Sequence, residues 1–424
     1  MKKIYFAMIL MLLAGLIAGP GMGCSPVQSG GESGNQNNDG SDDGNNGDDT
    51  TAPSQLLYPK DLSYQGAFRV PGGSNGTSWE WTSPSGGMTY YSDSLFATGF
   101  ALDMQISEIS IPTAVNSAQK NPSALNVATT IQPFHDIVGQ LVNVPALEIP
   151  RVGLQYLPAQ GNQTEEKLYF CWAGHFQDQG VSHGWCGTDL SNPGIAGGWQ
   201  IADYRIYSVN DYMFEIPGYW VQENTPGMRL ATGRFRDGGW SGQGPSLFAI
   251  GPWNQGNPPA AGSKLDAVPL LLYTSTEDYD APQHTMNDYH HSDEWTGGAW
   301  ISSNDKTAVI FAGTKGTGEC WYGDSNGPCL DCAGERGWWS DGFEGRFIFY
   351  DPADLAEVAL GTKEPHEPQP YASMNIDPVL YHIQSSQQWY HTGAVAYDRE
   401  RGVIYMMEPH GDGDKPLVHV WEIK

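Results

Sequence analysis

Three clusters of histidine, charged and aromatic residues carry the residue types that could do chemistry in this chain. In the first, HTMNDYHHSDEW, imidazoles lie close to carboxylates, and both are ligands that zinc and other transition metals use in proteins. The candidate metal ligands are His284, His290, His291 and Asp293. The oxygen-rich stretch EPHGDGD, residues 408–414, is a candidate Ca²⁺ loop. Zn²⁺ and Ca²⁺ are therefore the candidate cofactors, and solvated loop residues are the alternative.

The second cluster, GRFRDGGWSGQGPS, places two arginines and an aspartate beside flexible glycines and a tryptophan. Guanidinium groups form forked hydrogen bonds and stack on flat rings, so this combination suits a polar ligand. The candidate ligand-binding residues are Arg234, Arg236, Asp237 and Trp240. The alternative is an arginine–aspartate pair that braces the fold.

Tryptophans that neighbour glycines and carboxylates make up the third cluster. Trp338 and Trp339 precede Asp341 and Glu344, and Trp295 follows Glu294. A tryptophan beside a glycine can present an open face to a sugar ring, so these residues favour a glycan ligand. If the protein cleaved glycans, two carboxyl groups would have to lie about 5–10 Å apart. Glu294, Asp341 and Glu344 are the candidates, whereas core packing is the alternative explanation for the aromatic residues.

The cysteine-rich segment CWYGDSNGPCLDC, residues 320–332, combines a serine pattern, a CxxC pattern and a loop. GDSNG lacks the strand before and the helix after the serine that a hydrolase elbow needs. Three cysteines fall short of the four ligands of a structural zinc site. Disulfides are therefore the favoured interpretation. We expect Cys171–Cys186 and a bond from Cys320 to either Cys329 or Cys332.

Residues 1–23, MKKIYFAMILMLLAGLIAGPGMG, have the basic start, apolar run and small residues of a secretory signal peptide. Cys24 follows and resembles the lipidated cysteine of bacterial lipoproteins, with an ordinary secreted protein as the alternative. Residues 24–55 are rich in Gly, Asn, Asp and Ser, which predicts a disordered tether. We therefore expect an exported protein, anchored by lipid to the outer membrane or the cell surface.

The remaining chain, residues 56–424, has the pattern of an all-β domain. Apolar and aromatic runs separated by polar turns recur as hairpin signals in five segments, 86–100, 152–172, 242–253, 296–316 and 392–409. This repetition predicts a β-propeller of about five blades, with room for a sixth or seventh among weaker repeats. A β-sandwich or two all-β domains are the alternatives. Residues 62–71 and 416–424 both read as strands whose pairing would close the ring, and 351–362 is the one expected helix.

Several segments, among them SLFATGF (94–100), AVIFAGTKGTGECWYG (308–323) and PLVHVWEI (416–423), resemble a family of uncharacterised bacterial exported proteins with a propeller-like β body. The resemblance extends over most of residues 60–424. It implies export and a β fold, and it implies no activity.

The formal net charge of −27 argues against nucleic acid as a partner, because binding to phosphates needs a basic surface. Three functional hypotheses follow. The favoured one is a surface-tethered propeller that binds an extracellular ligand, with a glycan favoured and a surface protein as another partner. The alternatives are a glycoside hydrolase of propeller type and a structural or protein-interaction protein of the cell surface.

Overall fold

The computed structural model describes residues 52–80, 86–139, 141–142, 152–172, 178–275, 282–324, 327–328, 337–383, 385–386, 388 and 390–424. The expected signal peptide, Cys24 and nearly all of the expected tether lie outside these residues, so those predictions remain predictions.

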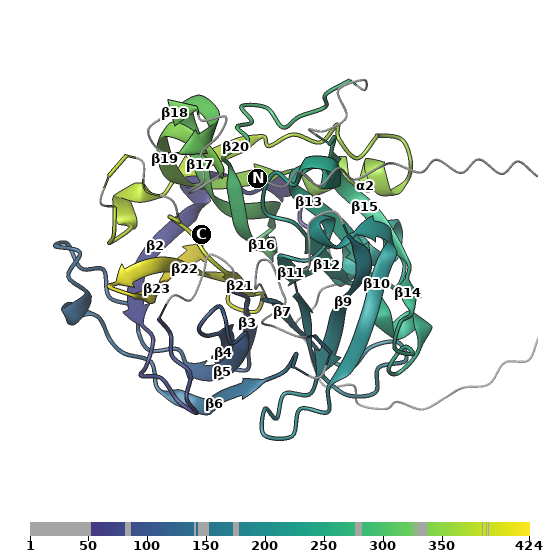
Figure 1. Ribbon diagram of the computed structural model, residues 1–424, viewed down its shortest axis with the longest axis horizontal. Helices are drawn as coiled ribbons and strands as arrows, with labels where there is room; N and C mark the ends of the chain where they lie inside the picture. Colours follow the sequence, from purple (N-terminus) through teal and green to yellow (C-terminus); the bar gives the residue numbers. More distant parts are fainter. Residues whose placement is uncertain are drawn as a thin grey trace, which may run out of the picture. The chain divides into compact units, whose positions relative to one another are not determined.

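Five sheets form the blades of a ring, as the sequence predicted (Figure 1). Blade A holds β3 (Met88–Tyr91), β4 (Ser94–Thr98), β5 (Gln105–Ser110) and β6 (Thr130–Asp136). Blade B holds β7 (Val152–Leu157), β8 (Lys167–Trp172), β9 (Gln179–Cys186), β10 (Ala196–Arg205) and the short β14 (Lys264–Leu265). Blade C holds β11 (Tyr212–Glu215), β12 (Leu230–Gly233), β13 (Gln243–Ile250) and β15 (Ala267–Tyr273).

The last two blades contain the longest strands and both ends of the described chain. Blade D holds β16 (Glu294–Ser303), β17 (Lys306–Asp324), β19 (Gly337–Tyr350), β20 (Ala372–Asn375) and the short strands β1 (Gln55–Leu56) and β18 (Gly327–Pro328). Blade E holds β21 (Val395–Asp398), β22 (Val403–Asp412), β23 (Lys415–Ile423) and β2 (Leu62–Arg69). The strands of the five sheets pair antiparallel except for the two-residue strands β1 and β14, which pair parallel with β17 and β10.

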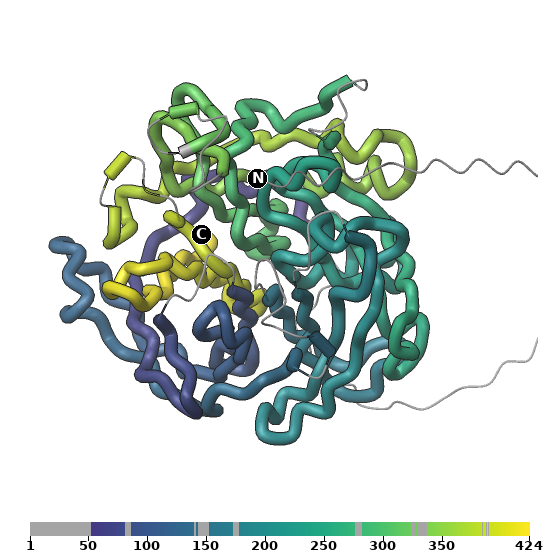
Figure 2. Tube along the Cα trace, viewed as in Figure 1, coloured from purple at the N-terminus to yellow at the C-terminus, as the bar shows by residue number. Residues whose placement is uncertain are grey.

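Blade E confirms the predicted closure of the ring. Its outer strand, β2, comes from the start of the described chain and pairs antiparallel with the C-terminal β23, from Leu62 opposite Ile423 to Arg69 opposite Leu417. In Figure 2 the purple trace of β2 runs beside the yellow C-terminal strands. Pairing the two ends removes two sheet edges and joins the last blade to the first.

Five hydrophobic cores, one between each pair of neighbouring blades, explain why most strands read as continuous apolar runs. In β17, Ala308, Ile310 and Ala312 face the core shared with blade E. Val309 and Phe311, between them, face the core shared with blade C. Alternate residues of a strand face opposite sides of the sheet. Because both faces of a blade are buried, the residues that face each side are apolar.

Two short helices lie outside the sheets. The helix expected at 351–362 is α2 (Pro352–Ala359), and the Asp351 carboxylate caps it by accepting a hydrogen bond of 2.8 Å from the Ala353 N–H. The second, α1 (Gly218–Asn224), was missed, because seven residues carry too little periodicity to be recognised.

The innermost strands β3, β7, β11, β16 and β21 contact one another in a closed ring and begin on the same face, which we call the top face. The opposite face is called the bottom face. Glycines bring the inner strands close together near their first residues. A Cβ on Gly87 would lie 2.4 Å from the Val152 carbonyl oxygen, and the space on the axis is only about 10 Å³. A second hollow among later residues of the same strands measures about 20 Å³, so neither of these two spaces can hold more than a water molecule or two.

Candidate functional site

The loop after β12 and the start of β16 meet on the top face, at the junction of blades C and D. Tyr212, the first residue of β11, pairs with Gly233, the last of β12, so the loop 234–242 lies on the top face. The Trp295 N–H donates to the Phe235 carbonyl oxygen at 2.7 Å, and Arg236 bridges to Glu294. The second and first predicted clusters therefore lie side by side, although about 50 residues separate them in the sequence.

An arm of blade D brings the third cluster to the same place. β17 and β19 continue past the top of the sheet, with pairs from Lys315 opposite Glu344 to Gly323 opposite Gly337. Tyr322 and Trp338 lie opposite each other on this arm, and their rings make an edge contact with centroids 5.4 Å apart. The green strands β17 and β19 of this arm are labelled in Figure 1.

A histidine–aspartate pair links the arm to the loop of blade C. His291 Nδ1 lies 2.5 Å from Asp237 Oδ2, and the Tyr289 hydroxyl donates to the same oxygen at 3.0 Å. The Gly239 N–H donates to Asp237 Oδ1 at 2.8 Å. Burial alone would raise the pKa of Asp237, but the hydrogen bonds from His291 and Gly239 hold it below its ordinary value. The His291 ring stacks on Trp338 with centroids 4.1 Å apart and planes 17° apart.

The two arginines of the loop occupy different environments. Arg236 donates to Glu294 Oε1 at 3.1 Å and to the Tyr207 hydroxyl at 2.9 Å, and its side chain is about one-third exposed. Arg234 is fully buried beneath Gly238, with its guanidinium carbon 4.4 Å from the Tyr207 ring centroid, and burial lowers its pKa. Arg236 can therefore reach a ligand, whereas Arg234 supports the loop from below.

Together these residues form one surface, which we call the aromatic–polar patch. Trp240 has 57% of its surface exposed and Tyr322 has 47%. Exposed aromatic side chains that gather into one patch beside fixed polar groups are typical of a binding surface. The patch consists of Arg236, Asp237, Trp240, His291, Glu294, Tyr322 and Trp338.

Two of the predicted ligand-binding tryptophans lie in the interior instead. Trp295 is fully buried in the core between blades C and D, and Trp339 is 8% exposed. Trp339 directly follows Trp338 on β19, and neighbouring residues of a strand point to opposite sides of the sheet. These two residues therefore have packing roles in this fold.

The four predicted metal ligands do not converge. The His284 ring stacks on His366, with centroids 3.8 Å apart. His290 Nδ1 and Asp293 Oδ1 instead surround the buried ammonium of Lys315, at 2.5 Å and 3.1 Å, and burial raises the pKa of Asp293. In the part of the chain that the structure describes, no three His, Cys, Asp or Glu side chains are grouped to hold a metal ion.

Two of the three carboxylates of the predicted calcium loop, those of Glu408 and Asp412, are engaged with protein groups. Asp412 pairs with Arg69 at 2.8 Å. Glu408 accepts hydrogen bonds from the backbone N–H groups of Tyr381 and His382 and lies 2.8 Å from His419 Nε2. These contacts brace blade E and the segment that leads into it.

The three candidate catalytic carboxylates each have a separate protein partner. Glu294 pairs with Arg236, and Glu344 pairs with Arg346. The exposed Asp341 accepts a hydrogen bond of 2.8 Å from the Glu319 N–H. The protein itself therefore engages each of the three carboxylates, and each has a different partner.

The expected Cys171–Cys186 disulfide is wrong. Cys171 lies opposite His183, and Cys186 lies opposite Leu168, three residues along the same strand. This odd offset points the two side chains to opposite faces, so Cys171 lies in the core between blades B and C and Cys186 in the core between blades A and B. Both are free thiols whose pKa values burial raises, that of Cys186 to about 12.

Cys320 is also a free thiol, and its sulfur lies 3.8 Å from the Ser292 hydroxyl. Its two expected partners, Cys329 and Cys332, lie outside the described residues. Of the described cysteines, no two lie at disulfide distance.

Sequence reasoning missed three residues that build the patch. Tyr289 and Tyr207 hold Asp237 and Arg236 in place, and Tyr322 adds an exposed ring. Tyr289 lies in HTMNDYHHSDEW, and Tyr322 lies in CWYGDSNGPCLDC. The histidines and cysteines of these segments suggested metal and disulfide sites, and the two tyrosines were not considered. Tyr207 had no local signal, because its contact with the loop exists only after the blades pack.

Comparison with known proteins gives no match to a protein-family model and no significant match to a curated protein. The resemblance to a family of exported bacterial proteins therefore stays a prediction. No helix within the described residues combines the length and apolar character needed to cross a membrane.

Proposed function

We propose that the protein is an exported lipoprotein whose β-propeller binds an extracellular glycan at the aromatic–polar patch. The observation that carries the proposal is that the paired rings of Tyr322 and Trp338 lie against His291, which binds Asp237 on the loop that exposes Trp240. Flat rings cover the apolar faces of sugars, and the paired Arg236 and Glu294 offer a donor and an acceptor to hydroxyl groups.

The pairing of charges within the patch favours a neutral sugar surface over a strongly charged ligand. Arg236 is balanced by Glu294, and Asp237 is hydrogen-bonded to His291 and Tyr289. Such groups are held in position before a ligand arrives, so binding loses little conformational entropy. The patch is therefore suited to recognition, and its carboxylates are already committed to protein partners.

The place where the chain joins the propeller fits a tethered protein. The Ser54 N–H and hydroxyl both donate to the Asp305 carboxylate at 2.7 Å, beside the β16–β17 turn on the bottom face. A lipid-anchored tether that ended there would leave the patch on the face away from its attachment. A Cys24→Ser variant should move the protein from the membrane fraction to the soluble fraction, and an unchanged distribution would argue against the lipid anchor.

A panel of immobilised polysaccharides tests the ligand. We would record both the protein retained and the sugar released, for the wild type, the double variant Trp240→Ala/Trp338→Ala and the control Tyr58→Ala. Tyr58 is another exposed aromatic residue, and it lies near the bottom face, outside the patch. Retention that the double variant loses and the control keeps supports the proposal. Released oligosaccharide would indicate a hydrolase. If the protein were not retained and no sugar were released, a structural or protein-interaction role would remain.

A further inference from the structure

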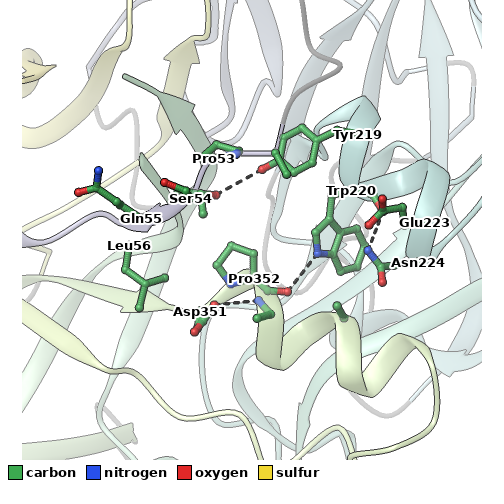
Figure 3. Close-up of a pocket in the computed structure, with 14 residues that line it drawn as sticks. Pro53, Ser54, Gln55, Leu56, Tyr219, Trp220, Glu223, Asn224, Asp351 and Pro352 are labelled. Carbon is green, nitrogen blue, oxygen red and sulfur yellow. Dashed lines mark hydrogen bonds between the residues drawn. The ribbon is translucent and has the colours of Figure 1, made fainter. Parts of the chain in front are cut away.

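A pocket of about 370 Å³ opens on the bottom face, at the other end of the junction between blades C and D. Helix α1, helix α2 and the N-terminal segment 52–56 form its walls (Figure 3). Its volume falls within the range of about 300–1,000 Å³ that is usual for small-molecule sites. The space on the propeller axis is far smaller, so this pocket is a distinct feature of the fold.

The walls of the pocket combine aromatic and apolar surface. Tyr219 and Trp220 come from α1, Pro352 and Ala356 come from α2, and Leu56 comes from β1. The Trp220 indole N–H donates to the Pro352 carbonyl oxygen at 3.0 Å, which joins the two helices. Trp220 is also packed against Trp300, with ring centroids 4.6 Å apart. Trp220 is therefore held in place by contacts on both sides, and it forms a fixed part of the wall before any ligand binds.

The charged residues that line the pocket, as far as the structure describes it, are acidic. Glu223 and Asp351 line it, and among the described residues that line it there is no Lys, Arg or His. The nearby cations have other partners, since Lys306 pairs with Asp61 and Lys363 with Asp354 and Glu357. A concave surface lined by charge of one sign concentrates its electric field, and the net charge of −27 strengthens it.

We propose that this pocket binds a small organic cation, an ammonium group attached to an apolar or aromatic body. The Glu223 carboxylate is exposed and makes no contact with another charged side chain of the described residues, so it is available to pair with an ammonium. The Tyr219 ring adds a cation–π surface. Thr307 and Asn224 supply further oxygens at the rim. This ligand is independent of the glycan proposed for the top face.

Three probes of matched shape test the proposal by calorimetric titration of the purified protein: 2-phenylethylammonium, 2-phenylethanol and 3-phenylpropanoate. We expect the ammonium to bind about tenfold more tightly than the alcohol, a difference of about 1.4 kcal/mol, because it gains both the ion pair with Glu223 and the cation–π contact with Tyr219. The carboxylate should not bind, because Glu223 and Asp351 repel it. Equal binding of ammonium and alcohol, or no binding of the ammonium, would overturn the proposal.

Two variants locate the binding. Glu223→Gln keeps the shape of the side chain and should weaken the ammonium about tenfold while leaving the alcohol unchanged. Glu364→Gln removes the same charge from an exposed position outside the pocket and should have no effect. Ala356→Phe should fill the pocket and abolish binding, with thermal unfolding recorded to verify that the variant is folded. Unchanged binding in Glu223→Gln, or in a folded Ala356→Phe variant, would contradict the assignment.

Discussion

The two ends of the junction between blades C and D are built differently, although one hydrophobic core lies between them. On the top face, long loops and the β17–β19 arm present polar groups that are paired with one another, as Arg236 is with Glu294. On the bottom face, two short helices and the N-terminal segment enclose a pocket with two carboxylates and no cation in its lining. Paired charges hold the side chains of a surface in position. Carboxylates without a neighbouring cation instead create a negative electrostatic potential, which attracts cations.

One junction between two blades can therefore hold two different binding sites, one at each of its ends. The shared core includes Phe214, Trp300 and Phe311 and holds both ends in place. The top surface is open and aromatic, which suits an extended ligand. The bottom pocket is concave and acidic, which suits a small cation. Variants of the core should therefore affect both ends, and variants of one face should affect that face alone.

The largest effect is expected at the centre of the ring. In Gly87→Ala the new Cβ would lie 2.4 Å from the Val152 carbonyl oxygen and 2.6 Å from the Leu154 nitrogen, both backbone atoms of the neighbouring inner strand. We expect a loss of about 2–4 kcal/mol in the free energy of unfolding, measured by urea denaturation. Binding at both faces should then fail at the same lowered temperature.

Gly72→Ala is the matched control for this change, because no atom lies within 4 Å of its added Cβ. It should leave the unfolding curve in place. If Gly87→Ala were as stable as this control, or if one face lost binding well before the other, the two faces would not share a single cooperative core.

A smaller effect, confined to the top face, is expected for Trp338→Ala. The change removes the ring on which His291 stacks and the partner of Tyr322. Retention on the glycan identified by the polysaccharide panel should fall about tenfold or more, since buried aromatic anchors dominate such interfaces. Affinity for 2-phenylethylammonium should stay unchanged. Parallel losses at both ends would show that the arm also supports the bottom pocket.

The smallest effect is a pH-dependent loss of stability in Asp237→Asn. The folded pKa of Asp237 lies below its ordinary value of about 3.9, so ionised Asp237 stabilises the fold above that pH and loses the effect as pH falls through the folded pKa. We expect the variant to be about 1–2 kcal/mol less stable at pH 7. Urea denaturation should show this gap closing below about pH 4. A gap that stayed constant into acid would mean that the charge of Asp237 contributes nothing.

The amino-acid sequence by itself determined the all-β architecture and its ring closure. Hairpin signals, polar turns and apolar runs are local patterns, and each of the five predicted segments lies in a different blade. The segment 242–253 is the exception to the hairpin prediction, because it forms the single strand β13 and its partners β12 and β15 come from residues outside it. The pairing of residues 62–69 with 415–423 could be anticipated because both segments read as strands at the two ends of the domain, where their pairing closes the ring and removes two sheet edges. The helix at 352–359 was recognisable from its Asp351 cap and the glycine after it.

Only the tertiary structure decided which residues lie together and which are exposed. Trp338 and Trp339 are neighbours with the same composition around them, yet their side chains point to opposite sides of β19, which leaves Trp338 half-buried and buries Trp339. Cys171 and Cys186 are compatible with a disulfide by spacing, but a register offset of three residues sends them into different cores. The bottom pocket needs α1, α2 and the segment 52–56, which are far apart in the chain. Parity, register and long-range contact depend on how the blades pack, so no local pattern of residues can specify them.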